Sequence, residues 1–104
     1  MYGQEHPNVA TSYNNIGKVY RKQGKYEEAL VQYQKALQVF LAVYGQDHPS
    51  VADSKYNIAL LHKGRQETEK ARQLFLECEK IYATVYGPDH SKTVDAARQA
   101  SRCV

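Results

Sequence analysis

The sequence predicts an all-α protein in which helix–turn–helix repeats stack into a solenoid. Apolar residues recur at steps of three and four, the spacing of an α-helix that buries one face. Polar stretches that contain glycine separate one helical pattern from the next, and glycine readily ends a helix. A short motif that begins at Gly3, Gly45 and Gly87 returns every 42 residues. A period of this length indicates a repeated two-helix unit.

Length and composition fit one small domain. The chain has 104 residues, of which 42% are hydrophobic and 24% are charged, and both fractions are ordinary for a soluble protein. The net charge of +3 and the pI of about 8.8 are too small to indicate nucleic-acid binding. The sequence has no signal-peptide pattern and no apolar run near about 18 residues. We therefore expect a cytoplasmic protein that contacts neither nucleic acid nor a membrane.

The repeated motif marks the start of each unit. It reads Gly-Gln-Glu-His-Pro from Gly3, Gly-Gln-Asp-His-Pro from Gly45 and Gly-Pro-Asp-His-Ser from Gly87. We interpret each copy as a glycine that ends one helix, a polar turn, and a proline at the first position of the next helix, where its missing N–H costs nothing. The third copy has Ser91 in place of proline, so this helix start is defined less sharply. The resulting division is a first repeat at about 3–44, a second repeat at about 45–86 and a capping helix at about 89–103.

The stretch 13–41 shows the repeat most clearly. The apolar stripe of its first helix consists of Val9, Tyr13, Ile16 and Tyr20, with Ala10 and Gly17 beside them. The stripe of its second helix consists of Ala29, Tyr33, Ala36, Phe40 and Tyr44, widened by Leu30, Leu37 and Leu41. Gly24 lies in the polar break between the two. Because so short a turn makes the helices antiparallel neighbours, we expect Gly17 and Ala29 to let their backbones approach closely.

The second repeat keeps both stripes but changes the turn. The stripes consist of Val51, Ala52, Ile58 and Ala59 in the first helix and Ala71, Phe75, Cys78, Tyr82 and Val85 in the second. Gly64 comes two positions earlier than the equivalent of Gly24, which predicts a longer turn with Thr68 near the N-cap. His62 replaces Tyr20 and is interpreted as a hydrogen-bonded core residue. Cys78 is interpreted as a reduced packing residue, since neither it nor Cys103 has a metal-binding or redox spacing.

The last stretch, 91–104, predicts one helix that caps the stack. We expect Val94, Ala97, Ala100 and Val104 to face the second repeat, because the end of a solenoid must cover its apolar face. At the other end, Tyr2 corresponds to Tyr44 and Tyr86. This correspondence leads us to expect that the chain is a fragment of a longer array.

These residues carry a family resemblance. The pattern of Tyr13, Ile16-Gly17, Tyr20, Gly24, Tyr26, Ala29, Tyr33 and Ala36 resembles the tetratricopeptide repeat (TPR). Leu41 stands where the 34-residue repeat has a proline, so the second helix should continue to Tyr44 and Gly45. The period of 42 and the phrase Tyr-Gly-x-Asp/Glu-His-Pro-x-Val-Ala resemble the kinesin-light-chain and nephrocystin class.

The resemblance implies a right-handed superhelix with a peptide-binding concave wall. In this class the first helix of each repeat forms that wall, which binds extended segments of partner proteins. Some kinesin light chains bind acidic, tryptophan-containing cargo motifs in this way. The resemblance therefore implies an adaptor or scaffold function.

The residues opposite the first-helix stripes form the candidate binding wall. An Asn amide offers both a donor and an acceptor, so Asn15 and Asn57, one period apart, could hold the backbone of an extended peptide. Basic residues on this wall outnumber Asp53 and Asp95, which favours an acidic ligand. The alternative is that these side chains are simply solvated. The candidate peptide-binding residues are Asn14, Asn15, Lys18, Arg21, Lys22, Tyr56, Asn57, Leu60, Lys63, Arg98 and Arg102.

Two classes of function remain open at this stage. One is a module that binds an acidic, extended peptide of a protein partner on its concave surface. The other is a structural spacer or self-assembling repeat segment without a peptide ligand. The first helix would expose Tyr13 and Tyr20 at its uncovered edge, and exposed apolar edges favour self-association.

Metal binding and catalysis are not expected. His6, His48 and His90 recur with the period, but an intervening helix separates equivalent positions by more than the roughly 8–10 Å of one helix contact. Two ligands of one zinc ion lie within about 4 Å of each other. The histidines are therefore assigned to the turns. Since no nucleophile with a base and no phosphate-binding loop is recognisable, we expect neither enzymatic activity nor a cofactor.

Overall fold

The computed structural model describes residues 6–103. They form five α-helices joined by short turns: α1 (Pro7–Lys22), α2 (Tyr26–Tyr44), α3 (Pro49–Gly64), α4 (Thr68–Tyr86) and α5 (Ser91–Arg102). The expected motif start at Gly3, the equivalence of Tyr2 and the expected contact of Val104 lie outside the described residues.

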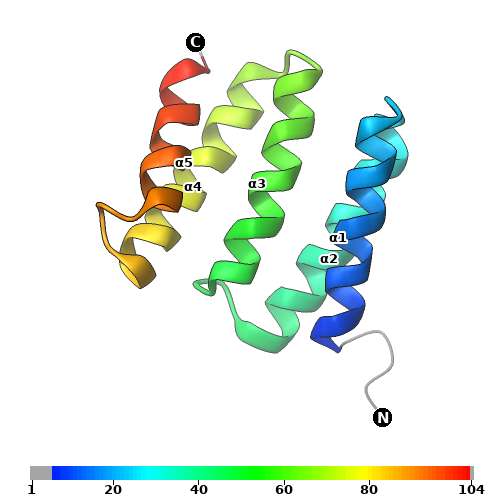
Figure 1. The fold of residues 1–104 in the computed structure, drawn as a ribbon, viewed down its shortest axis with the longest axis horizontal. Coiled ribbons are helices and arrows are strands. Elements are labelled where there is room, and N and C mark those ends of the chain that lie inside the picture. The colour runs from blue at the N-terminus through cyan, green and yellow to red at the C-terminus, as the bar shows by residue number, and fades with distance from the viewer. Residues whose placement is uncertain (1–5, 104) are drawn as a thin grey trace.

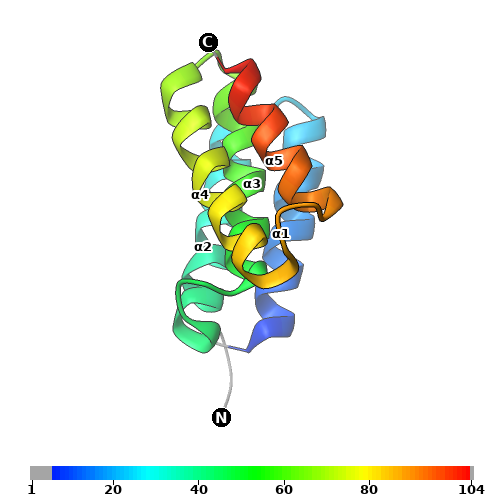
Figure 2. The same cartoon turned by 90° about the vertical axis from the view of Figure 1, so that its left-hand side faces the viewer.

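The helices are arranged in two layers. Helices α1, α3 and α5 form one layer and α2 and α4 form the other (Figure 1), and Figure 2 shows the two layers from the side. Each helix packs against the next one in the chain, and the molecule extends over 41 × 31 × 18 Å. The predicted all-α solenoid of stacked helix pairs is confirmed.

Each helix of the first layer begins with a histidine cap. Nδ1 of His6, His48 and His90 accepts a hydrogen bond from the backbone N–H two residues further on, at 3.0–3.1 Å. These bonds satisfy one of the free N–H groups at each helix start. Pro7 and Pro49 occupy the first helical position, as predicted. The assignment of the histidines to the turns is confirmed.

The predicted helix ends at Gly24 and Gly45 are confirmed, but the turn between α3 and α4 differs from the prediction. Gly24, φ +78°, follows α1, and Gly45, φ +85°, follows α2. In the second repeat, Gly64 is the last helical residue, and Gln66, the equivalent of Gly24, takes the left-handed conformation with φ 63°. The turn is therefore not longer than that of the first repeat. Its conformation is set by the packing of both helices and not by the position of the glycine.

The expectation that Thr68 lies near the N-cap of α4 is confirmed. Glu67 occupies the N-cap position without a side-chain cap, and Thr68 is the first helical residue. His62 is half-buried, and its Nδ1 lies 2.6 Å from Oε1 of Glu67. The expectation that His62 is hydrogen-bonded is confirmed, with Glu67 as its partner across the turn.

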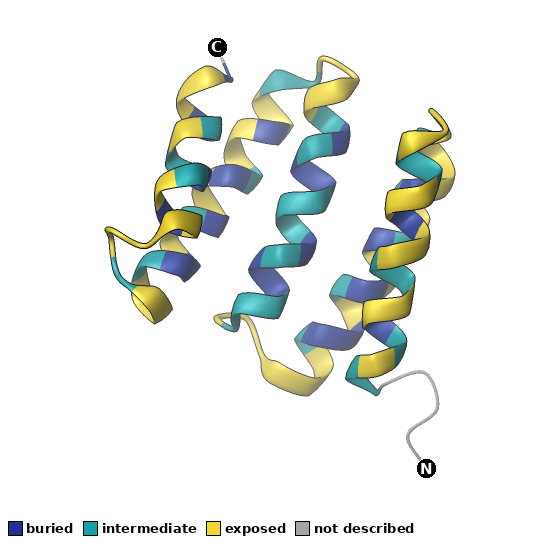
Figure 3. Ribbon diagram, viewed as in Figure 1, coloured by how far each residue is buried: buried dark blue, intermediate teal, exposed yellow. Residues whose placement is uncertain are grey.

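The core runs between the two layers (Figure 3). Gly17 and Ala29 are buried as predicted, but Ile16 is 44% exposed, whereas its equivalent in α3, Ile58, is only 6% exposed. Ile58 belongs to a cluster with Ala29 of the preceding helix α2. The described residues contain no helix that covers the corresponding face of α1. The assignment of Ile16 to the buried stripe was therefore wrong.

Helix α5 caps the second repeat with a face that matches the expected one only in part. Its inward residues are Thr93, Ala96 and Ala100, followed by Cys103, while Val94 is 40% exposed. This inward face is the one that α3 turns toward α2. Ala100 is therefore buried as predicted, but Val94 and Ala97 lie on the face that a first helix turns toward the second helix of its own repeat, so the inward placement of Val94 was wrong.

Tyr44 and Val85 are also more exposed than predicted. Both lie in the last turns of their helices, α2 and α4, where fewer neighbours cover them. The ring of Tyr44 instead stacks on His48, with 3.9 Å between the centroids.

Candidate peptide-binding groove

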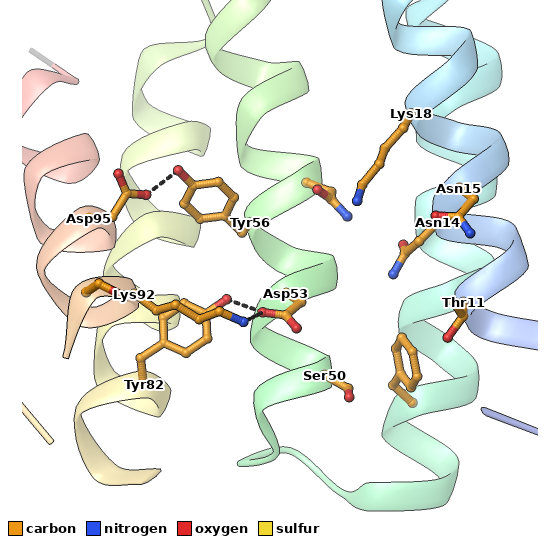
Figure 4. A pocket seen from close by; sticks show the side chains of 13 residues that line it. Thr11, Asn14, Asn15, Lys18, Ser50, Asp53, Tyr56, Tyr82, Lys92 and Asp95 are labelled. Atoms are coloured by element: carbon orange, nitrogen blue, oxygen red, sulfur yellow. Dashed lines mark hydrogen bonds and ion pairs between the residues drawn. The ribbon is translucent and has the colours of Figure 1, made fainter. Parts of the chain in front are cut away.

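A groove with a volume of about 640 Å³ crosses the layer formed by α1, α3 and α5 (Figure 4). Its walls come from the N-terminal and middle parts of these helices, and the last turns of α2 and α4 contribute one aromatic ring each. The lining residues are Thr11, Asn14, Asn15, Lys18, Phe40, Ser50, Asp53, Tyr56, Asn57, Tyr82, Ser91, Lys92 and Asp95.

The groove contains only part of the predicted site. Asn14, Asn15, Lys18, Tyr56 and Asn57 line it. The other candidates lie further toward the C-terminal ends of the same helices, outside the groove lining. They are Arg21, Lys22, Leu60, Lys63, Arg98 and Arg102.

The asparagine side chains have unused hydrogen-bonding capacity. Within residues 6–103, the side-chain amides of Asn15 and Asn57 form no hydrogen bond, and both residues line the groove. Asn14 donates from Nδ2 to Oγ of Ser54 at 3.4 Å, but its Oδ1 is buried without a partner. An unpaired buried acceptor is unfavourable, but this oxygen is closed to solvent, so the free amides that a ligand can reach are those of Asn15 and Asn57.

The half of the groove between α3 and α5 is occupied by internal hydrogen bonds. The hydroxyl of Tyr56 donates to the Asp95 carboxylate and accepts from Nε2 of Gln99 at 3.3 Å. Just beyond the lining, Nζ of Lys63 donates to Oε1 of Gln99 at 2.6 Å. Burial and the hydrogen bond to Asp95 raise the pKa of Tyr56 to about 12. The phenol therefore remains a donor at neutral pH, and this half of the groove is already paired.

A second hydrogen-bond network lies nearer the N-terminal ends of α3 and α5. The Tyr82 hydroxyl donates to Oδ1 of Asp53, which also lies 3.4 Å from Nζ of Lys92. Burial and the adjacent Asp53 carboxylate raise the pKa of Tyr82. Nζ of Lys92 also lies 5.7 Å from the centroid of the Tyr82 ring. Asp53 thus joins α3 to both α4 and α5.

The basic character expected of the wall is distributed unevenly. Inside the groove, Lys18 and Lys92 are balanced by Asp53 and Asp95. Beyond it, Lys22, Arg98 and Arg102 are exposed and have no ion-pair partner in the part of the chain that the structure describes. Arg21 is less accessible to a charged ligand than these three residues, because its Nε is buried without a hydrogen bond.

The lining residues that the prediction omitted come mainly from helix ends. Phe40 and Tyr82 were assigned to the core, and Ser50 and Lys92 follow the histidine caps. Phe40 and Tyr82, like Ser50 and Lys92, are 42 residues apart. This periodicity was the one signal in the sequence that could have added them to the wall.

Within residues 6–103, no cluster of His, Cys, Asp or Glu side chains is arranged to hold a metal ion. Burial raises the pKa of Cys78 to about 12, and its Sγ donates to the carbonyl of Ala52 at 3.2 Å, so its assignment as a reduced packing residue agrees with its surroundings. None of the helices in this range combines the length and apolarity needed to span a bilayer.

Comparison with solved structures supports the architecture. Kinesin light chain nearly identical TPR-like repeats from Podosopora anserina superpose with a TM-score of 0.85 at 19% identity, covering 95% of this chain and 47% of that one. BtubC (BKLC) from P. vanneervenii gives a TM-score of 0.79 at 22% identity, covering 97% and 46%. The chain thus spans about half the length of each. No curated protein matches the sequence.

The family itself is identified from the sequence. The tetratricopeptide repeat family matches residues 8–84, a range that includes all but the outermost residues of both helix pairs. Tetratricopeptide repeats are generally protein-interaction modules, and the fold resembles that of the kinesin-light-chain class. The chain belongs to the tetratricopeptide repeat family.

Proposed function

We propose that this chain binds an extended segment of a partner protein in the groove across α1, α3 and α5. The observation that carries the proposal is the pair of asparagine amides, Asn15 and Asn57, which lie one period apart and face the groove without hydrogen-bond partners in the described part of the chain. Each amide can donate to a peptide carbonyl and accept from a peptide N–H. Two such amides at a fixed separation suit a regular, extended backbone.

An acidic stretch of the partner would bind toward the C-terminal ends of the first-layer helices. Lys18 and Lys22 of α1 and Arg98 and Arg102 of α5 are exposed there without carboxylate partners in residues 6–103. Complementary charge of this kind steers association more than it adds affinity. In this proposal the module acts as an adaptor or scaffold in the cytoplasm and has no catalytic role.

A fluorescence polarisation experiment tests the proposal. Labelled acidic, neutral and basic peptides of equal length are titrated with the native chain and with the double variant Asn15→Ala/Asn57→Ala. Loss of up to four hydrogen bonds at roughly 0.5–1.5 kcal/mol each should weaken binding of the acidic peptides at least about tenfold. The matched control is Gln34→Ala/Gln73→Ala, which removes two exposed amides from α2 and α4. If all three proteins bind alike, or none binds any peptide, the groove proposal fails.

A second candidate function, a self-assembling repeat segment or spacer, is favoured by one specific observation. Val19 in α1 is 54% exposed, while its equivalent in α3, Leu61, is 1% exposed and packs in a cluster with Ala29 and Tyr33. The uncovered face of α1 therefore has the residue types of a stacking surface. Sedimentation at increasing concentration tests this candidate, since association through α1 should be lost in Ile16→Lys/Val19→Lys. A monomer at every concentration would reject it.

A further inference from the structure

The two repeats build the same aromatic frame beside the groove. At the end of α2, the rings of Phe40 and Tyr44 lie 6.0 Å apart and inclined by 18°, and Tyr44 stacks on His48. At the end of α4, 42 residues later, the equivalent rings of Tyr82 and Tyr86 lie 6.0 Å apart and inclined by 23°. Tyr86 likewise stacks on its cap histidine, with 4.4 Å between the centroids. The frame is therefore a repeated feature of the fold.

In the second repeat, a lysine of the chain itself occupies this frame. Nζ of Lys92 lies 5.7 Å from the ring centroid of Tyr82, 6.0 Å from that of Tyr86 and 3.4 Å from Oδ1 of Asp53. The ammonium group thus combines two aromatic faces with one carboxylate, an arrangement that stabilises a cation.

In the first repeat, the same place has no lysine. The equivalent of Lys92 is Ser50, and the equivalent of Asp53 is Thr11. Both side chains line the groove together with Phe40. Serine is much shorter than lysine, and the groove extends to the Phe40 ring at this place.

The carboxylate of Asp53 on α3 also borders the half of the groove between α1 and α3. Asp53 lies one helical turn after Ser50 on α3, and only its Oδ1 takes part in the bonds to Tyr82 and Lys92. Its second oxygen lies on the side of Ser50 and α1 in Figure 4. This second oxygen is therefore left for a further donor.

We infer that the frame of Phe40 and Tyr44 is a subsite for a lysine side chain of the bound segment, in the place that Lys92 fills in the next repeat. This inference rests on the proposed function for the source of the lysine. A bound segment would then have a basic side chain at the N-terminal ends of α1 and α3 and acidic residues toward their C-terminal ends. Basic and acidic side chains of the segment would then point toward opposite ends of these helices.

The test uses two small probes of equal shape, so that it does not depend on a peptide ligand. Nα-acetyl-lysine methylamide and Nα-acetyl-norleucine methylamide are titrated into the labelled chain, and the ring resonances of Phe40 and Tyr44 are followed by NMR. The lysine probe should shift these resonances in a saturable way, and the norleucine probe should not. Thr11→Asp, which supplies the second repeat's carboxylate, should tighten the lysine probe by up to about fivefold, the upper range for an exposed ion pair.

Two further variants exchange the residues found at this position in the two repeats. Ser50→Lys should abolish the response of Phe40 and Tyr44, because the new lysine occupies the subsite. Lys92→Ser should create a second response at the Tyr82 and Tyr86 rings. Equal shifts with both probes, or a response at Tyr82 in Lys92→Ser without one at Phe40 in the native chain, would overturn the subsite. Neither result would affect peptide binding through Asn15 and Asn57, which the polarisation experiment measures separately.

Discussion

Gly17 of α1 lies directly against the ring of Tyr33 of α2. A Cβ at residue 17 would stand 2.6 Å from Cε1 and 2.7 Å from Cδ1 of Tyr33, which is fully buried. In the second repeat the equivalent pair is Ala59 and Phe75, and both are fully buried as well. The first helix pair is therefore packed more closely around its aromatic ring than a methyl group at residue 17 allows.

Gly17→Ala should destabilise the fold although alanine favours helices. Displacing Tyr33 is an overpacking change, which costs about 1–3 kcal/mol of unfolding free energy, against a helix-propensity gain of up to about 1 kcal/mol. The matched control is Gly64→Ala, where the nearest atom to the new Cβ would be 3.7 Å away. Urea denaturation should show a loss for the first variant and no loss for the second. Equal midpoints would contradict the close packing of Gly17 on Tyr33.

Gln66→Gly should stabilise the fold. Gln66 has a positive φ of 63°, and a residue with a Cβ pays about 1–2 kcal/mol in this conformation. Glycine removes that strain, and part of the gain is offset by its greater freedom when unfolded. The reciprocal change, Gly24→Gln, should lower the melting temperature. A lower melting temperature for Gln66→Gly would mean that the glutamine side chain stabilises the turn in a way that its backbone conformation does not predict.

The contribution of Glu67 to stability should be lost in acidic solution, below the usual glutamate pKa. The hydrogen bond to His62, assisted by nearby Arg65 and Lys70, lowers the pKa of Glu67. Since the folded pKa lies below the unfolded one, the contribution is complete above the usual glutamate pKa of about 4.3. It is lost as the pH falls through the lowered folded value. The stability difference between the native chain and Glu67→Gln should therefore shrink over this window in denaturation series from neutral pH to about pH 3, and a constant difference would exclude the linkage.

Charge reversal outside the groove should affect association more than dissociation. Lys22→Glu/Arg98→Glu should slow the binding of an acidic peptide most strongly at low salt, because exposed charges are screened over about 10 Å at 0.1 M salt. Stopped-flow measurements across a salt series separate this effect from that of Asn15→Ala/Asn57→Ala, which should mainly speed dissociation. If charge reversal instead changed the dissociation rate alone at every salt concentration, the steering role would be rejected.

The sequence was sufficient to predict the helix pairs, because their ends are set by local chemistry. Gly24 and Gly45 follow helices where expected, and Pro7 and Pro49 begin them. The turn at Gln66 escaped prediction because tertiary packing imposes a left-handed conformation on a residue that does not favour it.

Side-chain directions were harder to predict than helix ends. A first helix in this fold has two buried faces, one toward the second helix of its own repeat and one toward the preceding repeat. The apolar spacing alone did not distinguish them, so Ile16 and Val94 were placed inward although both are exposed. The groove was predicted in part for the same reason: Asn15 and Asn57 follow from the register of one helix, whereas Phe40 and Lys92 reach it from neighbouring helices.

The most direct test of the account is an NMR chemical-shift map of the labelled chain with the tightest acidic peptide from the polarisation screen. The account predicts that the largest shifts fall on Asn15, Lys18 and Asn57, with little change at exposed residues of α2 and α4 such as Gln34 and Gln73. Shifts concentrated on α2 and α4, with the three groove residues unchanged, would contradict it.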